Sequence, residues 1–262
     1  MNQLIVDAIT PFKSITKKTF TLFIVIDVTL ILALWYMSPL MLLPKPHEVI
    51  ASMLDLFMNE DLVLSVWTSF KLNIKSILIA TVLSLSISYA YVIPIARPIV
   101  TFISSLRFLS MAGLVVAFVE ALSGTGLQIG LLVFGETTFF VTSMAAVVAS
   151  VPEDEIDYAR TLRFPSWKIV WEVIVLGKMD QAIELLRQNQ AMGWMMLTMV
   201  EGLVRAGGGI GKLLLDENKH YQIGKVYAIQ VILLLVGLCM DIFITWSKKK
   251  ICPHTALNGG KK

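Results

Sequence analysis

The sequence has little charge, little cysteine and little histidine. Charged residues make up 16% of its 262 positions, whereas a typical soluble domain carries about 25%. The two cysteines, Cys239 and Cys252, have no metal-ligand spacing around them, and the three histidines lie far apart. We therefore expect no metal site, no cofactor and no catalytic cluster. A GxxxxGK[ST] phosphate-binding loop is also missing, so the chain is not expected to be an enzyme, and any ATP that it uses must be hydrolysed by another chain.

Hydrophobic residues, by contrast, make up 56% of the sequence and gather in long runs, with a mean hydropathy of +0.75. A bilayer core needs about 20 mostly apolar residues per helix, and helices keep their backbone polar groups paired in lipid. Six runs qualify, at 20–37, 74–93, 99–122, 127–149, 188–204 and 226–246. The third contains Arg107, and the fifth is the most polar. The predicted fold class is an all-α membrane protein with about six transmembrane helices.

The distribution of basic residues predicts the orientation of these helices. With a cytoplasmic N-terminus, fourteen Lys and Arg residues fall on the inner side and seven on the outer side, while Arg107 lies within a span. Positive charge accumulates on cytoplasmic loops, so both termini are expected inside the cell. The net charge of +3 is explained by this topology and gives no sign of nucleic-acid binding.

Three regions are expected along the chain. Residues 1–66 would hold an N-terminal tail, the first transmembrane helix and an external amphipathic segment that begins a helix at Pro46. Residues 67–247 would form the transmembrane core. Residues 248–262 would be a basic cytoplasmic tail, beginning with Lys248, Lys249 and Lys250.

The longest cytoplasmic connection, residues 150–187, carries helix signals. Ser150 with Glu153 fits a capping box, and Pro152 suits a first helical turn. A short helix is therefore predicted through about Leu162, followed by a break near Phe164 and Pro165 and a second helix from Ser166. From charge and periodicity alone, an amphipathic helix lying on the membrane surface is an equally good interpretation.

Several motifs of this sequence resemble those of one transporter family. The run Asp157-Tyr158-Ala159-Arg160-Thr161-Leu162 is similar to the Glu-Ala-Ala-Arg-Thr-Leu-Gly motif of binding-protein-dependent ABC permeases. The segment 43–49, Leu-Pro-Lys-Pro-His-Glu-Val, resembles the nitrate, sulfonate and taurine branch, and so do Val200-Glu201-Gly202-Leu203 and the glycine-rich stretch 207–211. The sequence departs from the motif at Asp157, Tyr158 and Arg163, and Val175-Leu176 stand where Leu-Pro is usual.

The resemblance implies the permease subunit of an ABC importer in the inner membrane. Its expected partners are ABC ATPase subunits inside, a substrate-binding protein outside and a second permease copy, within membrane lipid. The short helix between the fourth and fifth spans would be the coupling helix that docks on the ATPase, with Ala159 in an ATPase cleft. The residues expected at this contact are Asp157, Tyr158, Ala159, Arg160, Leu162 and Arg163.

Polar residues inside the spans are candidates for a translocation path, because ionisable groups in a bilayer usually face a cavity or a partner. Two helical faces carry them at spacings of three or four residues. The candidates are Gln128 and Glu136 on the fourth span and Gln190, Trp194, Thr198 and Glu201 on the fifth. Hydrogen bonding between helices is an equally good explanation. Asp27, Arg107 and Asp241 are expected to be structural.

The leading hypothesis is thus ATP-driven uptake of a small solute, similar to nitrate, a sulfonate or taurine. The alternative is a stand-alone secondary transporter or channel that uses the intramembrane acids as ion sites. Such a transporter would carry inverted internal repeats, which the sequence does not show.

Overall fold

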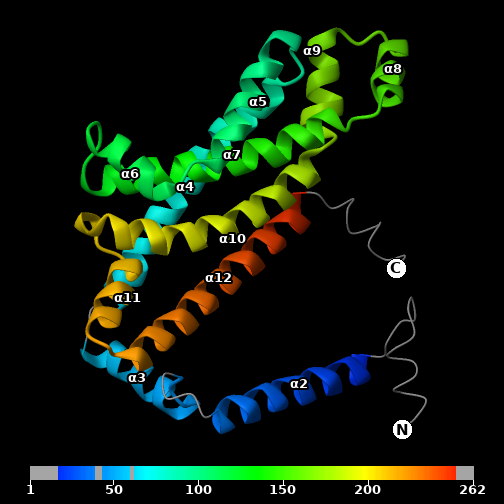
Figure 1. Cartoon of the computed structure of the whole chain (residues 1–262). Helices are drawn as coiled ribbons and strands as arrows, with labels where there is room; N and C mark the ends of the chain where they lie inside the picture. The colour runs from blue at the N-terminus through cyan, green and yellow to red at the C-terminus, as the bar shows by residue number, and fades with distance from the viewer. Residues whose placement is uncertain (1–16, 39–42, 60–61, 252–262) are drawn as a thin grey trace.

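The computed structural model describes residues 17–38, 43–59 and 62–251, and these residues form helices and connections without a strand. Figure 1 shows their arrangement. The α-helices are α2 (Lys17–Met37), α3 (Pro46–Asn59), α4 (Leu62–Ala90), α5 (Arg97–Ser105), α6 (Met111–Val119), α7 (Gly124–Ala149), α8 (Glu153–Thr161), α9 (Ser166–Ile169), α10 (Met179–Leu203), α11 (Ile210–Lys219) and α12 (Ile223–Ile251). Short 3₁₀ turns are η1 (Pro94–Ala96), η2 (Leu106–Phe108) and η4 (Arg205–Gly207), and η3 (Val170–Leu176) is a π-helix.

Four of the described helices are long and apolar enough to cross a membrane. They span Thr19–Met37, Leu62–Ala90, Gly124–Ala149 and Ile223–Ile251, and they confirm the first, second, fourth and sixth predicted runs as helices. The predicted amphipathic helix beginning at Pro46 is also confirmed, as α3. The predicted N-terminal tail (1–16) and most of the predicted C-terminal tail (252–262) lie outside the described residues.

The prediction of one continuous third span is wrong. Residues 94–108 and Met111–Val119 form two helical pieces bent by 108°. The break falls at Leu109 and Ser110, whose backbones are extended (ψ 137° and 129°) and so cannot continue a helix. Arg107 lies in the last turn before the bend, with its guanidinium 4.9 Å from the centre of the Phe108 ring. No acidic side chain of the described residues forms an ion pair with it.

The fifth predicted run is part of a longer helix. α10 begins at Met179, before the predicted start at 188, and its first turns carry charged residues. Taken as a whole, it is not among the helices apolar enough to count as a span. The described chain therefore has four candidate spans, or five if the bent pair is one span.

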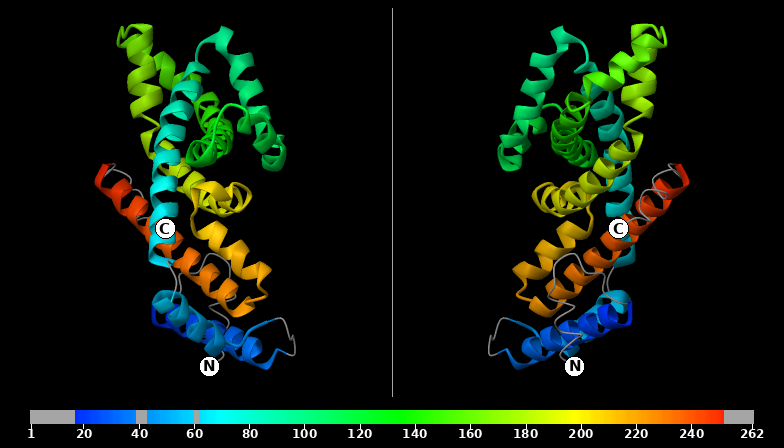
Figure 2. Two further views of the ribbon diagram at one scale, coloured as in Figure 1. Left: turned by 90° about the vertical axis from the view of Figure 1, so that its left-hand side faces the viewer. Right: turned by 90° about the vertical axis from the view of Figure 1, so that its right-hand side faces the viewer.

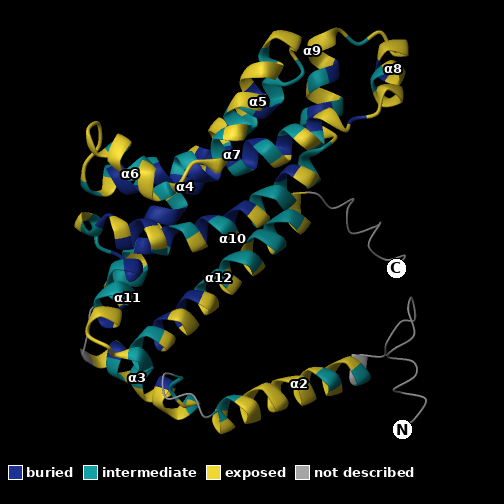
Figure 3. Cartoon of the chain, viewed as in Figure 1, coloured by how far each residue is buried: buried dark blue, intermediate teal, exposed yellow. Residues whose placement is uncertain are grey.

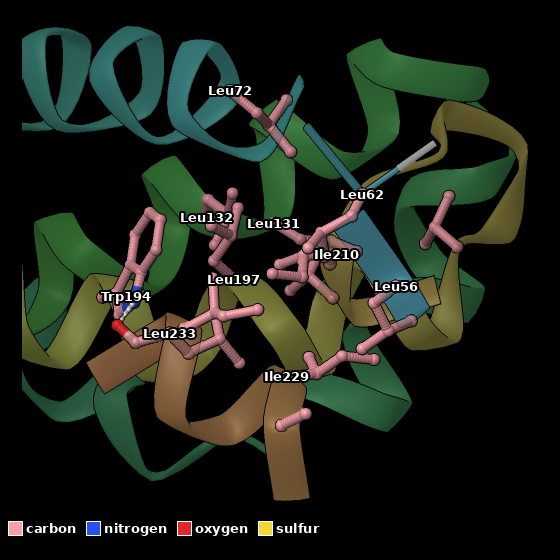
Figure 4. Close-up of a cluster of buried hydrophobic side chains, with 14 of the residues drawn as sticks. Leu56, Leu62, Leu72, Leu131, Leu132, Trp194, Leu197, Ile210, Ile229 and Leu233 are labelled. Atoms are coloured by element: carbon pink, nitrogen blue, oxygen red, sulfur yellow. Dashed lines mark hydrogen bonds between the residues drawn. The ribbon is translucent and has the colours of Figure 1, made fainter. Parts of the chain in front are cut away.

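The core is built around α7, which packs mainly against α4 and α10. Figure 4 shows one buried apolar cluster, in which Leu131, Leu132, Leu197 and Leu233 from α7, α10 and α12 meet. A second cluster joins the end of α7 to the following loop and the start of α10; its members are Phe140, Met144, Val148, Val151, Ile174 and Ala182. In Figure 3 the helix α2 is exposed along its length, and none of its candidate span is buried.

The loop that carries α8 and the helix α3 lie at opposite ends of the molecule. Figure 1 shows α8 and α9 at the top and α3 at the bottom, and both side views of Figure 2 agree. α10, which follows the loop, packs against α12, and α12 packs against α3, so these two helices link the two ends.

Candidate functional site

A stripe of small polar residues runs along the face of α4 that packs on α7 and α10. Its members recur every three to four residues or a multiple of that spacing, and all are fully buried: Ser69, Asn73, Ser76, Ser84 and Ser88. Small polar side chains let helices approach closely and hydrogen-bond across the contact. Three residues of the stripe, Ser69, Asn73 and Ser76, hydrogen-bond to predicted path residues on the facing helices.

Glu136 of α7 lies in this interface and not on an open surface. It is 1% exposed, and its Oε1 accepts a hydrogen bond of 3.4 Å from the Ser76 hydroxyl. On α10 it faces Gly193, where an added Cβ would overlap the carboxyl group. Its other oxygen has no hydrogen-bond partner among the described residues. The carboxyl group is therefore enclosed by three helices.

Gln190 and Trp194 link α10 to its neighbours through their polar atoms. The Gln190 amide donates to Oδ1 of Asn73 over 2.6 Å, and the Trp194 indole N–H donates to the Leu233 carbonyl over 3.0 Å (Figure 4). Both side chains are mostly buried. Asn73 was not predicted as a site residue, although its place directly before the apolar run 74–93 is a signal that could have identified it.

Glu201 and Gln128 contact the glycine-rich segment, which we define as residues 204–211, from the end of α10 into the first turn of α11. Oε2 of Glu201 accepts a hydrogen bond of 2.8 Å from the Gly211 amide, and Oε1 accepts one of 2.6 Å from Ser69. The Gln128 amide donates to the Val204 carbonyl over 2.8 Å. Both side chains are thus held by the loop that follows α10.

A groove of about 470 Å³ lies between α10 and α12. Its polar lining includes three predicted path residues, Gln190, Trp194 and Thr198, together with Gln230 of α12. Gln128, Glu136 and Glu201 do not line it. The structure therefore divides the six predicted path residues into three that line the groove and three that do not.

One end of the groove is closed by an ion-pair network. Arg187 contacts Asp241 of α12 and Glu184 of its own helix, each over 2.6 Å, and Lys248 contacts Glu184 over 2.8 Å. Hydrogen bonds from Arg187 and then Lys248 lower the pKa of Glu184, which lies before the apolar part of α10. Asp241, expected to be structural, pairs with Arg187 and also lines the groove. Arg187 was not predicted, although its spacing of three residues from Glu184 on a helix was visible in the sequence.

The loop after α7 contains the predicted short helix, with a different start. α8 begins after Pro152, which takes the N-cap position, and no side chain caps the helix. The capping box at Ser150 is therefore wrong: the Ser150 hydroxyl instead donates back to the Val147 carbonyl over 2.9 Å. The predicted break after Leu162 and the new helix from Ser166 are confirmed.

Arg163 adopts the conformation that glycine usually supplies at this position. Its φ is +56°. The Arg163 amide donates to the Arg160 carbonyl over 2.8 Å, and the Phe164 amide donates to the Ala159 carbonyl over 3.3 Å. These two bonds form a Schellman motif that ends α8. The departure from glycine leaves the turn in place.

The Ala159 side chain, expected in an ATPase cleft, faces the folded-back loop of its own chain. Ala159 is only 4% exposed, because α8 folds back on α9 and η3. The outward face of α8 is formed instead by Tyr158 and Leu162, which are 69% and 52% exposed. Asp157 and Arg160 form an exposed ion pair of 2.7 Å on the same helix.

The second bend of the loop is made by a π-helix. η3 ends at Leu176, and the amide of the next residue, Gly177, donates to the Glu172 carbonyl over 3.0 Å, five residues back. A Cβ at Gly177 would overlap the Val173 carbonyl oxygen. The chain thus turns into α10 without the proline that the resemblance predicts near Leu176. π-bulges of this kind are frequent at functional sites.

Comparison with known proteins identifies this arrangement. Residues 92–252 match the family "Binding-protein-dependent transport system inner membrane component". No curated protein matches the chain. Two solved structures share its fold, both titled as inward-facing conformations of the MetNI methionine ABC transporter. The native crystal form has a TM-score of 0.57 and 17% identity, and the selenomethionine-soaked form has 0.51 and 18%. Each match covers 72% of this chain and 94% of the other.

The matched residues span α5 to α12, including the loop that carries α8, the groove and the glycine-rich segment. ATP hydrolysis in such transporters belongs to a separate ATPase subunit, in agreement with the lack of a phosphate-binding loop in the sequence. A stand-alone secondary transporter does not fit this match. The chain belongs to the family of binding-protein-dependent transport inner membrane components, as a multi-pass permease subunit of an ABC importer.

Proposed function

We propose that two copies of this chain form the path of an importer, with two ATPase subunits docked inside and a binding protein outside. Each copy crosses the membrane six times, with both termini in the cytoplasm. The bent pair α5–α6 serves as the third span, and the apolar part of α10, from residue 188, serves as the fifth. Regions 1–66, 67–247 and 248–262 are the peripheral N-terminal part, the transmembrane core and the basic tail. The two-to-one excess of basic residues on the inner side supports this topology.

The observation that carries this proposal is the outward face of α8. Exposed apolar side chains such as Tyr158 and Leu162 are unusual at the tip of a nine-residue helix with three acidic residues in its first turn. Beside them lies the Asp157–Arg160 pair. A face with buried-type residues at its centre and charges at its rim is typical of a protein interface. It is the surface through which the ATPase subunit moves the permease.

A mutational series tests this contact. Leu162→Glu and Tyr158→Glu are expected to lower co-purification of the ATPase at least tenfold, because they place charge in a desolvated contact. Met58→Glu is the matched control, since Met58 is even more exposed (80%) but lies on α3 at the other end. Normal ATPase binding by both α8 variants would contradict the proposal.

A charge swap separates the two roles of the ion pair. The double variant Asp157→Arg/Arg160→Asp keeps an ion pair within α8. At each of the two positions, however, it presents the opposite charge to the ATPase. If the pair only stabilises α8, the double variant binds the ATPase normally. If the pair contacts the ATPase, both the double variant and Arg160→Glu bind weakly.

The path proposed here is the groove between α10 and α12, completed by the second copy. Gln190, Thr198 and Gln230 supply neutral hydrogen-bonding groups, and Trp194 supplies an apolar wall. The cation that lines it, Arg187, is already paired with two carboxylates. The three buried path candidates, Gln128, Glu136 and Glu201, would shape this path from behind. The resemblance favours a small solute such as nitrate, a sulfonate or taurine.

Cysteine labelling in a variant lacking the native cysteines tests the path. Thr198→Cys lines the groove and should react with a water-soluble maleimide. Met199→Cys is the control, because Met199 is exposed, neighbours Thr198 and does not line the groove. It should react only with a lipid-soluble maleimide. Equal labelling of both positions by the water-soluble reagent, or of neither, would remove the groove from the path.

A further inference from the structure

We propose that Glu201 and Ser69 are positioning residues that fix α11 and the glycine-rich segment onto α4 and α10. On this view Glu201 acts on transport through the position of α11, without touching the solute. The role of Glu201 in transport rests on the proposed path between α10 and α12. The anchoring of α11 rests on the contacts alone.

The two side chains cap the start of α11 from two different helices. Ser69 of α4 accepts a hydrogen bond of 2.8 Å from the Ile210 amide and donates one of 2.6 Å to Glu201. Glu201 of α10 accepts a bond of 2.8 Å from the Gly211 amide. Amides in the first turn of a helix have no partner within the helix, and a carboxylate is favourable there. Both side chains are 0% exposed, so water cannot replace either of them.

The glycines of the segment supply the space that this anchor needs. A Cβ at Gly209 would overlap the Glu201 carboxylate, and one at Gly211 would overlap the Thr198 carbonyl. Gly209 also has a φ of +106°, which side-chain-bearing residues rarely adopt. The carboxylate and the glycines facing it therefore form one close-packed unit.

Gln128 of α7 holds the same segment from another side. Its amide donates to the Val204 carbonyl over 2.8 Å and to the Gly208 carbonyl over 3.4 Å. A Cβ at Gly207 would overlap this amide. Three core helices thus each contribute one buried polar side chain to a single loop.

This anchor determines the geometry at one end of the groove. Thr198 lines the groove, lies one turn before Glu201, and contacts Gly211 through its backbone. A shift of α11 would therefore move the backbone that carries Thr198. Glu201 is not part of the groove lining, so its effect on transport must come through this displacement.

The hydrogen-bond pattern predicts which variants are tolerated. In Glu201→Gln, the amide oxygen still accepts from Gly211, and the amide nitrogen donates to Ser69, whose hydroxyl has two acceptor sites. Glu201→Ala removes both interactions and leaves a buried amide unpaired. Ser69→Ala leaves the Ile210 amide without an acceptor. Ser86→Ala is the matched control, because Ser86 lies on α4, is exposed, and bonds only to the Val82 carbonyl.

Hydrogen exchange of residues 204–215 in the purified, ATPase-bound complex tests the anchor. Ser69→Ala and Glu201→Ala should speed exchange there at least tenfold, whereas Glu201→Gln and Ser86→Ala should change it less than twofold. Two results would overturn the proposal. One is that Glu201→Gln exchanges as fast as Glu201→Ala. The other is that Ser69→Ala exchanges no faster than Ser86→Ala. If Glu201→Ala does not assemble, the comparison of Ser69→Ala with Ser86→Ala decides the question.

The role in transport has its own readout, which is the rate of ATP hydrolysis by the reconstituted complex. Ser69→Ala should lower the rate at least threefold, whereas the single variant Glu201→Gln should retain more than half of the normal rate. Faster exchange with an unchanged ATPase rate would leave the anchor purely structural and overturn its role in transport. Because exchange needs no solute, failure of the proposed path and failure of the anchor give different results.

Discussion

Replacing Arg163 with glycine is expected to stabilise the end of α8, even though it removes a large side chain. Arg163 has a φ of +56° within a Schellman motif. An L-residue in this conformation costs about 1–2 kcal/mol relative to glycine. Glycine also gains entropy in the unfolded chain, which offsets about 0.4–1 kcal/mol of that benefit. A net gain of about 0.5–1 kcal/mol remains, which should oppose local opening of α8.

Hydrogen exchange of the α8 amides measures this gain directly, because the helix opens locally without global unfolding. A gain of this size corresponds to exchange slowed about two- to fivefold. Tyr221→Gly is the matched control, since Tyr221 also has a φ of +56° and ends α11 with the same pair of bonds. It should slow exchange in α11 and leave α8 unchanged.

Arg163→Ala separates the backbone from the side chain. Alanine keeps the cost of the left-handed conformation and removes only the guanidinium, so exchange in α8 should stay within about twofold of the natural protein. If alanine slows exchange as much as glycine does, the effect comes from the lost charge. If glycine speeds exchange, the conformation of Arg163 is not strained, and the reasoning is refuted.

Three further changes test the packing and charge of the core. Gly177→Ala should disrupt the π-helix, because its Cβ overlaps the Val173 carbonyl oxygen, so ATP hydrolysis should continue without transport. Gly193→Ala should destabilise the detergent-solubilised protein by about 1–3 kcal/mol, because its Cβ overlaps the Glu136 carboxyl group; a second change, Glu136→Ala, should restore part of the loss. Glu184 has a lowered pKa, so its stabilisation is present above its ordinary pKa of 4.5 and is lost as the pH falls through the lowered value. On acidification, the melting temperature of Glu184→Gln should therefore fall less than that of the natural protein; an equal fall would contradict this.

Most helices could be predicted from the sequence, because a long apolar run indicates a membrane helix without any knowledge of its tertiary contacts. It did not identify the break at Leu109 and Ser110. Neither residue is glycine or proline, and the apolar run continues through both. The bend instead accompanies the packing of α5 and α6 on α7, a tertiary effect that overrides local preference.

Periodicity placed polar residues on the correct faces but could not name their neighbours. Gln190, Trp194 and Thr198 share the groove, as their spacing predicts. Glu201 continues the same spacing yet does not line the groove, because the chain turns after Val204 and returns across it. Likewise, the small size of Ala159 indicated a close contact, but the contact is with the folded-back loop of the same chain. For both Glu201 and Ala159, the contacting residues follow a turn of the chain, so helical periodicity could not identify them.

The loop and the groove are connected by contacts that the sequence could not reveal. Lys178, just before α10, contacts Glu155 of α8 over 3.0 Å. Ile174 of the π-helix packs in the same buried cluster as Phe140 and Met144 of α7. A force on α8 therefore acts at once on the start of α10 and on the end of α7. Because packed interiors transmit displacement with little compression, the same force reaches the groove-lining face of α10, whereas α2, which is unburied along its span, has no part in this route.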